Sequence, residues 1–373
     1  MNRLILIGNG FDLAHGLPTT YNDFILWYLK KVFVTANARD GYKDNLIEIS
    51  MKFNYKELYD RHFITLEDFI DHYYQVGFKE VIKDSELRNL RKGLIVSNPF
   101  NVTMVPFLRT LVTNCNFMNW VDIENEYYDA LKQLLDLIKE QQRQALFELN
   151  QAMETLVSEL RLYFKSLKKP IVSRAIEDIF SAPIRPRELN NSKNTNQKEY
   201  KPEATYILSF NYTDTAQMYA NAAFHNLERV ELNCIHGQAN DHSTPLIFGF
   251  GDELDSKYSE LELSRINDYF NFIKSFGYLK TRNYHSMLRF INSNKYQIYI
   301  LGHSCGLSDR TMLNMLFKHD NCQSIKIYYH QTAEGKNNFT ELTQEISRHF
   351  KNKEMLREKV VNFEFCEPLP QVR

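Results

Sequence analysis

The sequence has few cysteines, and none of them are spaced as in metal or redox motifs. Five cysteines are scattered through 373 residues, and no two of them are separated by only two positions. This pattern excludes a disulfide framework and a zinc ribbon as the basis of the fold. We therefore expect a cytoplasmic protein that needs no metal.

Long apolar runs and an excess of one charge are also missing. The apolar run Leu4–Ile7 is too short for a signal peptide or a membrane span, and no longer run follows. With 45 basic and 46 acidic residues the net charge is -1. No overall field therefore favours a membrane surface or nucleic acid as partner. Assembly into a homo-oligomer stays open.

Alternation of strand and helix patterns predicts the fold class. The chain opens with a strand at Leu4–Ile7, a glycine loop, and a helical pattern from Tyr21 to Leu29. Further strands are expected at Tyr206–Ser209, Val230–Ile235, Leu246–Phe248, Gln297–Leu301, Ile325–Tyr329 and Val360–Phe365. We expect an α/β protein with a mostly parallel, Rossmann-like sheet.

A long segment between the first strand and the others has apolar residues at helical spacing. It extends from about residue 40 to 180, and the polar stretch 190–200 follows it. The predicted domains are a nucleotide-binding domain of residues 1–40 and 200–373, and a large α-helical insertion of residues 41–199.

The loop after the first strand reads GNGFDLAHG and contains the first candidate site residues. Glycines let backbone N–H groups approach phosphate oxygens, and a helix N-terminus adds partial positive charge. The spacing of Gly8, Gly10 and Gly16 differs from the ordinary dinucleotide fingerprint, so a purely structural turn is an alternative. Asp12 would repel a diphosphate, so we expect it to face a ribose hydroxyl, act on the sugar, or cap the helix.

Two more clusters follow predicted strands. In SFNYTD, Asn211 could hold a sugar hydroxyl or a water, or form an Asx turn. In IHG, a strand places His236 at the sheet edge, where a histidine suits general acid or base chemistry at neutral pH.

The fourth cluster, GHSCGLSD, fits two chemistries. Gly302 and Ser304 could bind phosphate or ribose at a helix start. The same letters satisfy the nucleophile elbow of serine hydrolases, with Ser304 followed by Asp320 and His330 in the required order. Glu124 and Asp252 are weaker candidates, and the macrodipole of a helix start explains Glu124 better than catalysis does.

Together, LILIGNGFDLAHGLPTTYNDF, LSFNYTDT, IHG with IFGFGDE, and YILGHSCGLSD resemble the abortive-infection AbiH family of bacterial phage-defence proteins. The same order of motifs is distantly similar to sirtuin-like domains that bind NAD. That resemblance puts Asn211 and His236 at the places of the catalytic Asn and His. The chain lacks the four-cysteine zinc module of deacylating sirtuins, which argues against protein deacylation.

These observations lead to one expected site at the carboxyl ends of the strands. We expect an antiphage effector that binds NAD and hydrolyses its nicotinamide–ribose bond, with a phage-derived trigger as a possible partner. The alternatives are a non-catalytic nucleotide sensor and a serine hydrolase. The expected catalytic residues are Asn211, His236 and Asp12. The expected cofactor contacts are Gly8, Asn9, Gly10, Phe11, His15, Asp214, Gly237, Gly302, His303, Ser304 and Asp309.

Overall fold

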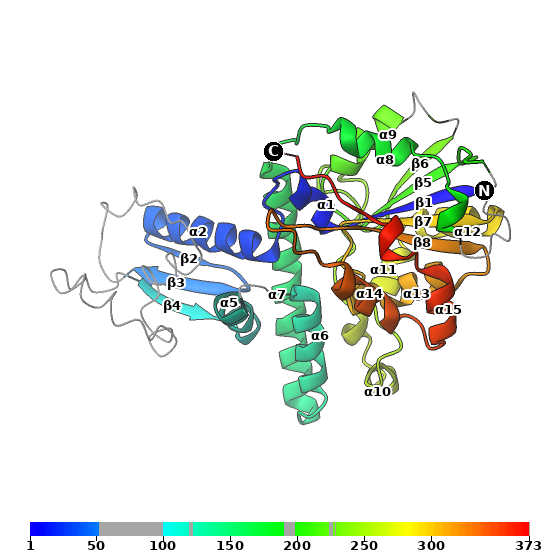
Figure 1. The fold of residues 1–373 in the computed structure, drawn as a ribbon. Coiled ribbons are helices and arrows are strands. Elements are labelled where there is room, and N and C mark those ends of the chain that lie inside the picture. Colours follow the sequence, from blue (N-terminus) through cyan, green and yellow to red (C-terminus); the bar gives the residue numbers. More distant parts are fainter. Residues whose placement is uncertain (52–99, 119–121, 190–197, 224–226, 228, 373) are drawn as a thin grey trace. The chain divides into compact units, whose positions relative to one another are not determined.

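The computed structural model describes residues 1–51, 100–118, 122–189, 198–223, 227 and 229–372 (Figure 1). The chain folds as two compact units, Met1–Thr19 with Phe164–Arg373, and Thr20–Tyr163. The sequence placed the boundaries at residues 40 and 200 instead. Of the predicted polar loop at residues 190–200, positions 190–197 lie outside the described residues.

The first unit is built on a parallel sheet of six strands. Its strands are β1 (Asn2–Ile7), β5 (Thr205–Ser209), β6 (Val230–Cys234), β7 (Tyr296–Leu301), β8 (Cys322–Tyr329) and β9 (Glu367–Pro368), in the spatial order β6-β5-β1-β7-β8-β9. Every neighbouring pair is parallel. Along the chain, β5 and β6 are added on one side of β1, and β7, β8 and β9 are then added on its other side. This is the doubly wound order of dinucleotide-binding domains, with its switch point between β1 and β7.

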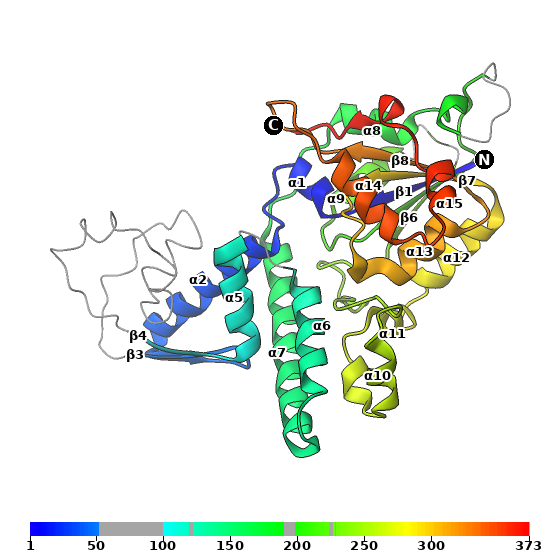
Figure 2. The same ribbon diagram turned by 60° about the horizontal axis from the view of Figure 1, so that its bottom comes forward.

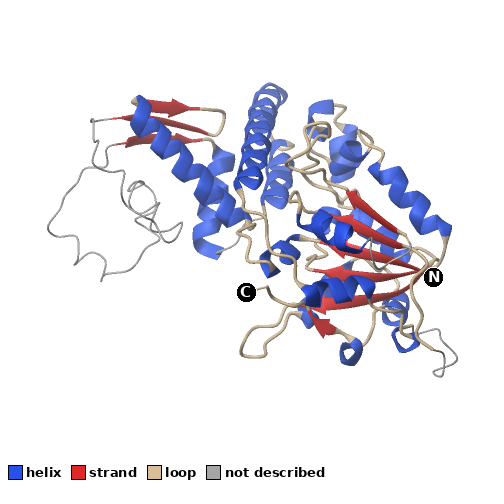
Figure 3. Ribbon diagram, turned by 90° about the horizontal axis from the view of Figure 1, so that it is seen from above, coloured by secondary structure: helices blue, strands red, loops and turns tan. Residues whose placement is uncertain are grey.

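Helices lie on both faces of the sheet (Figures 2 and 3). Alternating strand residues form one core on each face. Leu4 and Leu6 of β1 face one core, whereas Ile5 and Ile7 face the other. Because both faces are buried, the strands read as continuous apolar runs in the sequence. The first core packs against helices α12 (Asn283–Ser293), α13 (Arg310–Lys318) and α14 (Phe339–Arg348), and the second against α1 (Asn9–Ala14), α8 (Arg174–Ser181) and α9 (Thr215–Ala223).

Two predicted strands of this unit are wrong. Residues 246–248 form no strand. The segment Val360–Phe365 has only an isolated bridge at Val360 and a 3-10 turn, η5 (Phe363–Phe365), and the last strand β9 follows it. The other elements of the unit are α10 (Tyr258–Leu263), α11 (Lys274–Tyr278), α15 (Lys353–Lys359), η2 (Pro186–Glu188), η3 (Asn267–Phe270) and η4 (Leu307–Asp309).

The described residues of the second unit are mainly helical, as expected for the insertion, but they also form a small sheet that the sequence did not reveal. Its helices are α2 (Tyr21–Arg39), α5 (Pro106–Met118), α6 (Ile123–Leu134) and α7 (Lys139–Ser166, which ends in the first unit), and its antiparallel strands are β2 (Gly41–Lys43), β3 (Ile47–Met51) and β4 (Phe100–Met104). A capping box of Thr20 and Asp23 starts α2. Tyr127 of α6 packs on Phe107 of α5 and donates to Asn150 of α7 at 2.8 Å.

Candidate functional site

Four loops separated by up to three hundred residues meet at the carboxyl edge of the sheet. They follow β6, β5, β1 and β7, which are neighbours in this order. The side-chain amide of Asn211 donates to the Gly8 carbonyl at 3.0 Å, and the Gly10 N–H donates to the Gly302 carbonyl at 2.7 Å. The structure therefore brings together the segments near residues 8, 211, 236 and 302.

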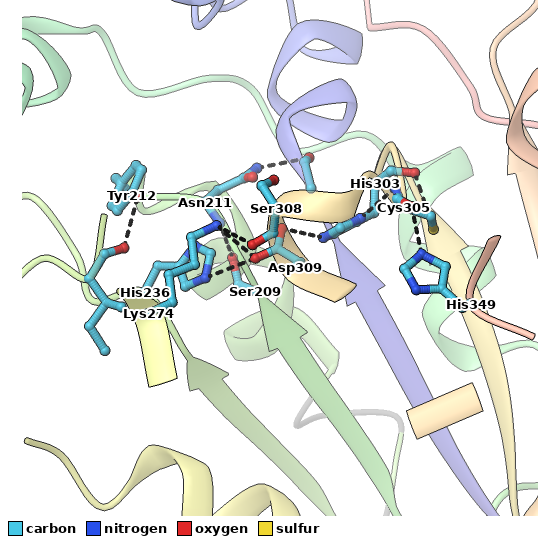
Figure 4. Close-up of polar contacts among 12 residues, drawn as sticks. Ser209, Asn211, Tyr212, His236, Lys274, His303, Cys305, Ser308, Asp309 and His349 are labelled. Atoms are coloured by element: carbon cyan, nitrogen blue, oxygen red, sulfur yellow. Dashed lines mark hydrogen bonds and ion pairs between the residues drawn. The ribbon is translucent and has the colours of Figure 1, made fainter. Parts of the chain in front are cut away.

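A buried carboxylate, Asp309, lies at the centre of this edge (Figure 4). Its Oδ1 is 2.8 Å from Lys274 Nζ and 3.5 Å from His236 Nε2, and its Oδ2 is 3.7 Å from His303 Nε2. Burial raises the pKa of Asp309, but Lys274 and the two histidines outweigh burial and hold that pKa well below its usual value. Asp309 is therefore ionised, and its carboxylate lies between two histidines from the loops that follow β6 and β7.

His303 is held in one tautomer by its own loop. The Cys305 N–H donates to His303 Nδ1 at 2.9 Å, so Nδ1 is an acceptor and the ring hydrogen is on Nε2, which faces Asp309. Burial lowers the pKa of His303 to about 4, although Asp309 opposes this shift. In neutral His303, Nδ1 therefore accepts from Cys305 and the Nε2 hydrogen faces Asp309. This arrangement suits a residue that orients the Asp309 carboxylate, and it leaves no ring nitrogen to accept a proton.

His236 differs from His303 because its Nε2 lies near a hydroxyl as well as near Asp309. The centroids of the Tyr212 and Tyr278 rings are both 6.1 Å from the centroid of the imidazole, and Nε2 is 3.2 Å from the Tyr278 hydroxyl. Burial and the Lys274 charge lower the pKa of His236, which Asp309 opposes. A neutral His236 that accepts from Tyr278 has a lone pair on Nε2, and the nearby carboxylate would stabilise the imidazolium formed on protonation.

Asp12 is a second buried carboxylate at the same edge. Its Oδ2 accepts a hydrogen bond from Thr213 Oγ1 at 2.7 Å, whereas its Oδ1 has no partner among the described residues. Burial raises the pKa of Asp12 to about 6, and hydrogen bonding from Thr213, Thr215 and Asn211 limits the rise. The capping interpretation of Asp12 is wrong, because Gly8 is the N-cap of α1 and Asp12 lies within the helix.

The glycines of the first and fourth clusters let the two loops pack closely on each other. A Cβ on Gly8 would lie 2.5 Å from His303 Cα, and one on Gly10 would lie 2.8 Å from the Gly302 oxygen. The Gly8 N–H donates to Leu301 O at 3.2 Å, and the Gly10 N–H is also engaged. The N–H groups of Gly8 and Gly10, which we expected to contact a phosphate, therefore donate to backbone carbonyls in this structure.

The other predicted contacts divide into buried structural residues and exposed ones. Phe11 is buried, and His15 bonds the Phe11 carbonyl and the Tyr219 hydroxyl through its two ring nitrogens. Asp214 accepts from Asn240 at 2.7 Å, and Gly237 forms a turn with φ +82. The exposed side chains are Asn9 and Ser304, which follow the adjacent strands β1 and β7. These two remain available to a ligand at the switch point.

The triad of Ser304, Asp320 and His330 that the serine hydrolase alternative requires is wrong. Asp320 precedes β8 and His330 follows it, so they lie at opposite edges of the sheet. An eight-residue strand is roughly 26 Å long, so the two cannot form a triad with Ser304.

The two weaker carboxylate candidates have structural roles. Asp122 caps α6 by accepting from the N–H groups of Glu124 and Asn125, which agrees with the helix-start interpretation, and Glu124 lies in the second unit. Asp252 accepts from the Leu254 N–H and pairs with Arg310 at 3.0 Å.

The sequence did not identify Lys274 or Tyr278 as site residues. Both belong to the short helix α11, and Lys274 is 1% exposed. A lysine is rarely buried without a charged partner, and Asp309, 35 positions away, is that partner. The pattern FIKSFGY contains no local signal of this pairing.

The strand order and the converging loops define a doubly wound α/β protein of the class that binds ligands at the switch point of its sheet. The sequence model of the family described as "Bacteriophage abortive infection AbiH" matches residues 4–331. The chain therefore belongs to the AbiH family, and membership points to an antiphage role in abortive infection. No curated protein matches the chain in a sequence comparison. Among the described residues, no helix is both long and apolar enough to cross a bilayer.

Proposed function

We propose that this chain binds NAD at the carboxyl edge of its six-stranded sheet and hydrolyses the nicotinamide–ribose bond during abortive infection. The observation that carries the proposal is the neutral His236 beside the ionised pair of Asp309 and Lys274, at the switch-point edge of a doubly wound sheet. The resemblance to sirtuin-like domains names NAD as the nucleotide.

The polar groups at this edge fit a ribose better than a diphosphate. The free Oδ1 of Asp12 can accept from a hydroxyl and would repel a phosphate. Since the Gly8 and Gly10 amides are engaged, the diphosphate would instead use the exposed Asn9 and Ser304. We therefore expect NAD to place a ribose next to Asp12 and its diphosphate next to Ser304.

The reaction adds one water across the bond between nicotinamide and ribose. As this bond breaks, the ribose acquires positive charge, and the Asp12 carboxylate would stabilise it. Water then attacks the anomeric carbon and gives its proton to His236 Nε2, while nicotinamide leaves as a neutral amide. Asp309, held by Lys274 and His303, would stabilise the resulting imidazolium.

Access to His236 sets a condition on the proposal. The residue is 3% exposed, and the rings of Phe210, Tyr212 and Tyr278 pack around it. Substrate binding must therefore displace at least one of these covering side chains. A low basal rate that rises with a phage-derived trigger is the expected behaviour.

The test is to incubate the purified protein with NAD, with and without extract of phage-infected cells, and to measure NAD binding and nicotinamide release. His236→Ala should keep binding and lower nicotinamide release by about 10²–10⁴-fold, which is the usual effect of removing a general base. The matched control is His285→Ala, because His285 is exposed on α12. Equal rates for His236→Ala and the parent would refute the catalytic assignment, and binding without release under both conditions would favour a nucleotide sensor.

A further inference from the structure

A row of buried polar side chains crosses the sheet near the amino ends of its strands. Arg3 of β1 is in direct register with Thr205 of β5 and Gln297 of β7, and Gln297 is in register with Ser324 of β8. All four residues are at most 1% exposed. They lie on the face of the sheet that packs against α8 and α9, because Ile5 and Ile207, two positions further along, belong to that core.

One edge of the Arg3 guanidinium has no hydrogen-bond partner among the described residues. Its Nη1 donates to the Ala182 carbonyl, and its guanidinium lies 4.2 Å from the centroid of the Tyr299 ring. Its Nε and Nη2 have no hydrogen-bond partner among the described residues. The N–H groups of Nε and Nη2 point in the same direction and form the fork with which arginine binds both oxygens of a carboxylate.

The carboxylate of Glu188 lies near this row of residues, but it interacts with groups other than Arg3. Glu188 is 2.9 Å from Lys326 Nζ, accepts from Gln297 Nε2 at 3.1 Å, and lies 3.7 Å from Arg185. Within the described ranges, no carboxylate oxygen lies within 4.0 Å of Arg3. A buried guanidinium with two unsatisfied nitrogens is strongly destabilising unless an acceptor occupies its edge.

The neighbours of Arg3 offer matching groups. Thr205 Oγ1 and Gln297 Oε1 are also buried without partners among the described residues. The Thr205 hydroxyl can donate to an anion, and Gln297 Oε1 can accept from a hydroxyl. A ligand with two acceptor oxygens and one O–H group would satisfy the fork and both neighbours.

We propose that this row is a binding site for a small planar oxyanion of the bicarbonate type. Two of its oxygens accept from Nε and Nη2 of Arg3, the Thr205 hydroxyl donates to it, and its own hydroxyl donates to Gln297 Oε1. Arg3 precedes Gly8 by five residues of strand, roughly 16 Å, so this site is separate from the one at the carboxyl edge. The inference does not depend on the proposed function.

The test measures the melting temperature of the whole chain in sodium bicarbonate and in sodium chloride at the same pH and ionic strength. The parent protein should melt about 3 °C higher in bicarbonate, and the difference should grow with its concentration. Equilibrium dialysis with labelled bicarbonate should give one ion per chain. Equal melting temperatures in both salts with no retained label would overturn the proposal.

Two variants test whether bicarbonate binding depends on the hydrogen bonds at this site or only on the positive charge of Arg3. Arg3→Lys keeps the positive charge but lacks the fork, so it should lose the bicarbonate-dependent shift, whereas the exposed control Arg289→Lys should keep it. Thr205→Val removes one hydrogen bond and should weaken bicarbonate binding by about 3–10-fold, a measurement that holds if Arg3→Lys fails to fold. Retention of the full shift in Arg3→Lys, or parental affinity in Thr205→Val, would contradict the proposed contacts.

Discussion

The ammonium group of Lys274 lies 2.8 Å from Oδ1 of Asp309, and the two side chains are 1% and 11% exposed. The pair joins helix α11 to the 3-10 turn η4. It also determines the protonation of the site, since Lys274 keeps Asp309 ionised and disfavours a charge on His236.

Lys274→Met should destabilise the protein strongly. Removing one partner of a buried ion pair leaves the other charge without compensation, which typically costs about 3–5 kcal/mol. Urea unfolding followed by circular dichroism measures the change. The control is Lys257→Met, because the Lys257–Glu260 pair is half-exposed and its loss should change stability by at most about 1 kcal/mol. If the double variant Lys274→Met with Asp309→Asn is no more stable than Lys274→Met alone, the uncompensated carboxylate is not the cause.

Asp12→Asn should stabilise the protein at neutral pH more than at acidic pH. Because the folded pKa of about 6 lies above the unfolded value of 3.8, the protonated carboxyl stabilises the fold at low pH, and this contribution is lost as pH rises through 6. The loss amounts to about 3 kcal/mol. Asparagine cannot ionise, so the advantage of the variant should grow by most of that amount, about 2 kcal/mol, between pH 4 and 7.5. Urea unfolding at the two pH values measures it, and a difference that stays constant would be inconsistent with a buried ionising carboxylate.

His303→Gln should reduce the sensitivity of the fold to acid. The folded pKa of His303, about 4, lies below the unfolded value of 6.5, so its contribution to stability is complete above pH 6.5 and is lost as pH falls towards 4. This loss is about 3 kcal/mol and is opposite in sign to that of Asp12. Since the two contributions partly cancel in the parent, the variants must be compared one at a time. Urea unfolding of His303→Gln at pH 7.5 and 4.5 should show a smaller decline than the parent, and an equal decline would rule out the assigned role of His303.

The predictable parts of this molecule were those with a local cause. Leu4–Ile7 and Gln297–Leu301 are central strands buried on both faces, so their apolar runs appear in the sequence. The parallel sheet was predicted from the alternation of strands and helices, and it brings the loops after β1, β5, β6 and β7 to one edge. The AbiH motifs lie in those same loops.

The unpredictable parts depend on residues far apart in the chain. Burial of Lys274 requires Asp309, and the fixed tautomer of His303 requires the backbone of Cys305 in a left-handed conformation with φ +57. The sheet β2–β4 was missed because two of its strands are separated by residues 52–99, and strand pairing over such a distance has no local signal. The glycines looked like phosphate contacts because close packing between loops and close approach of a ligand select the same residue type.

Gly10→Ala distinguishes these two uses of glycine. The added Cβ would lie 2.8 Å from the oxygen and 2.9 Å from the Cα of Gly302, and both are backbone atoms that cannot rotate away. Forcing the β1 and β7 loops apart should lower the free energy of unfolding by about 1–3 kcal/mol without any nucleotide present. The control is Gly306→Ala in the neighbouring loop, where the nearest atom, Ser304 Oγ, would be 3.7 Å from the new Cβ. Unchanged stability of Gly10→Ala combined with weaker NAD binding would show instead that the glycine serves the ligand, because only the contact between loops predicts a loss in the unliganded protein.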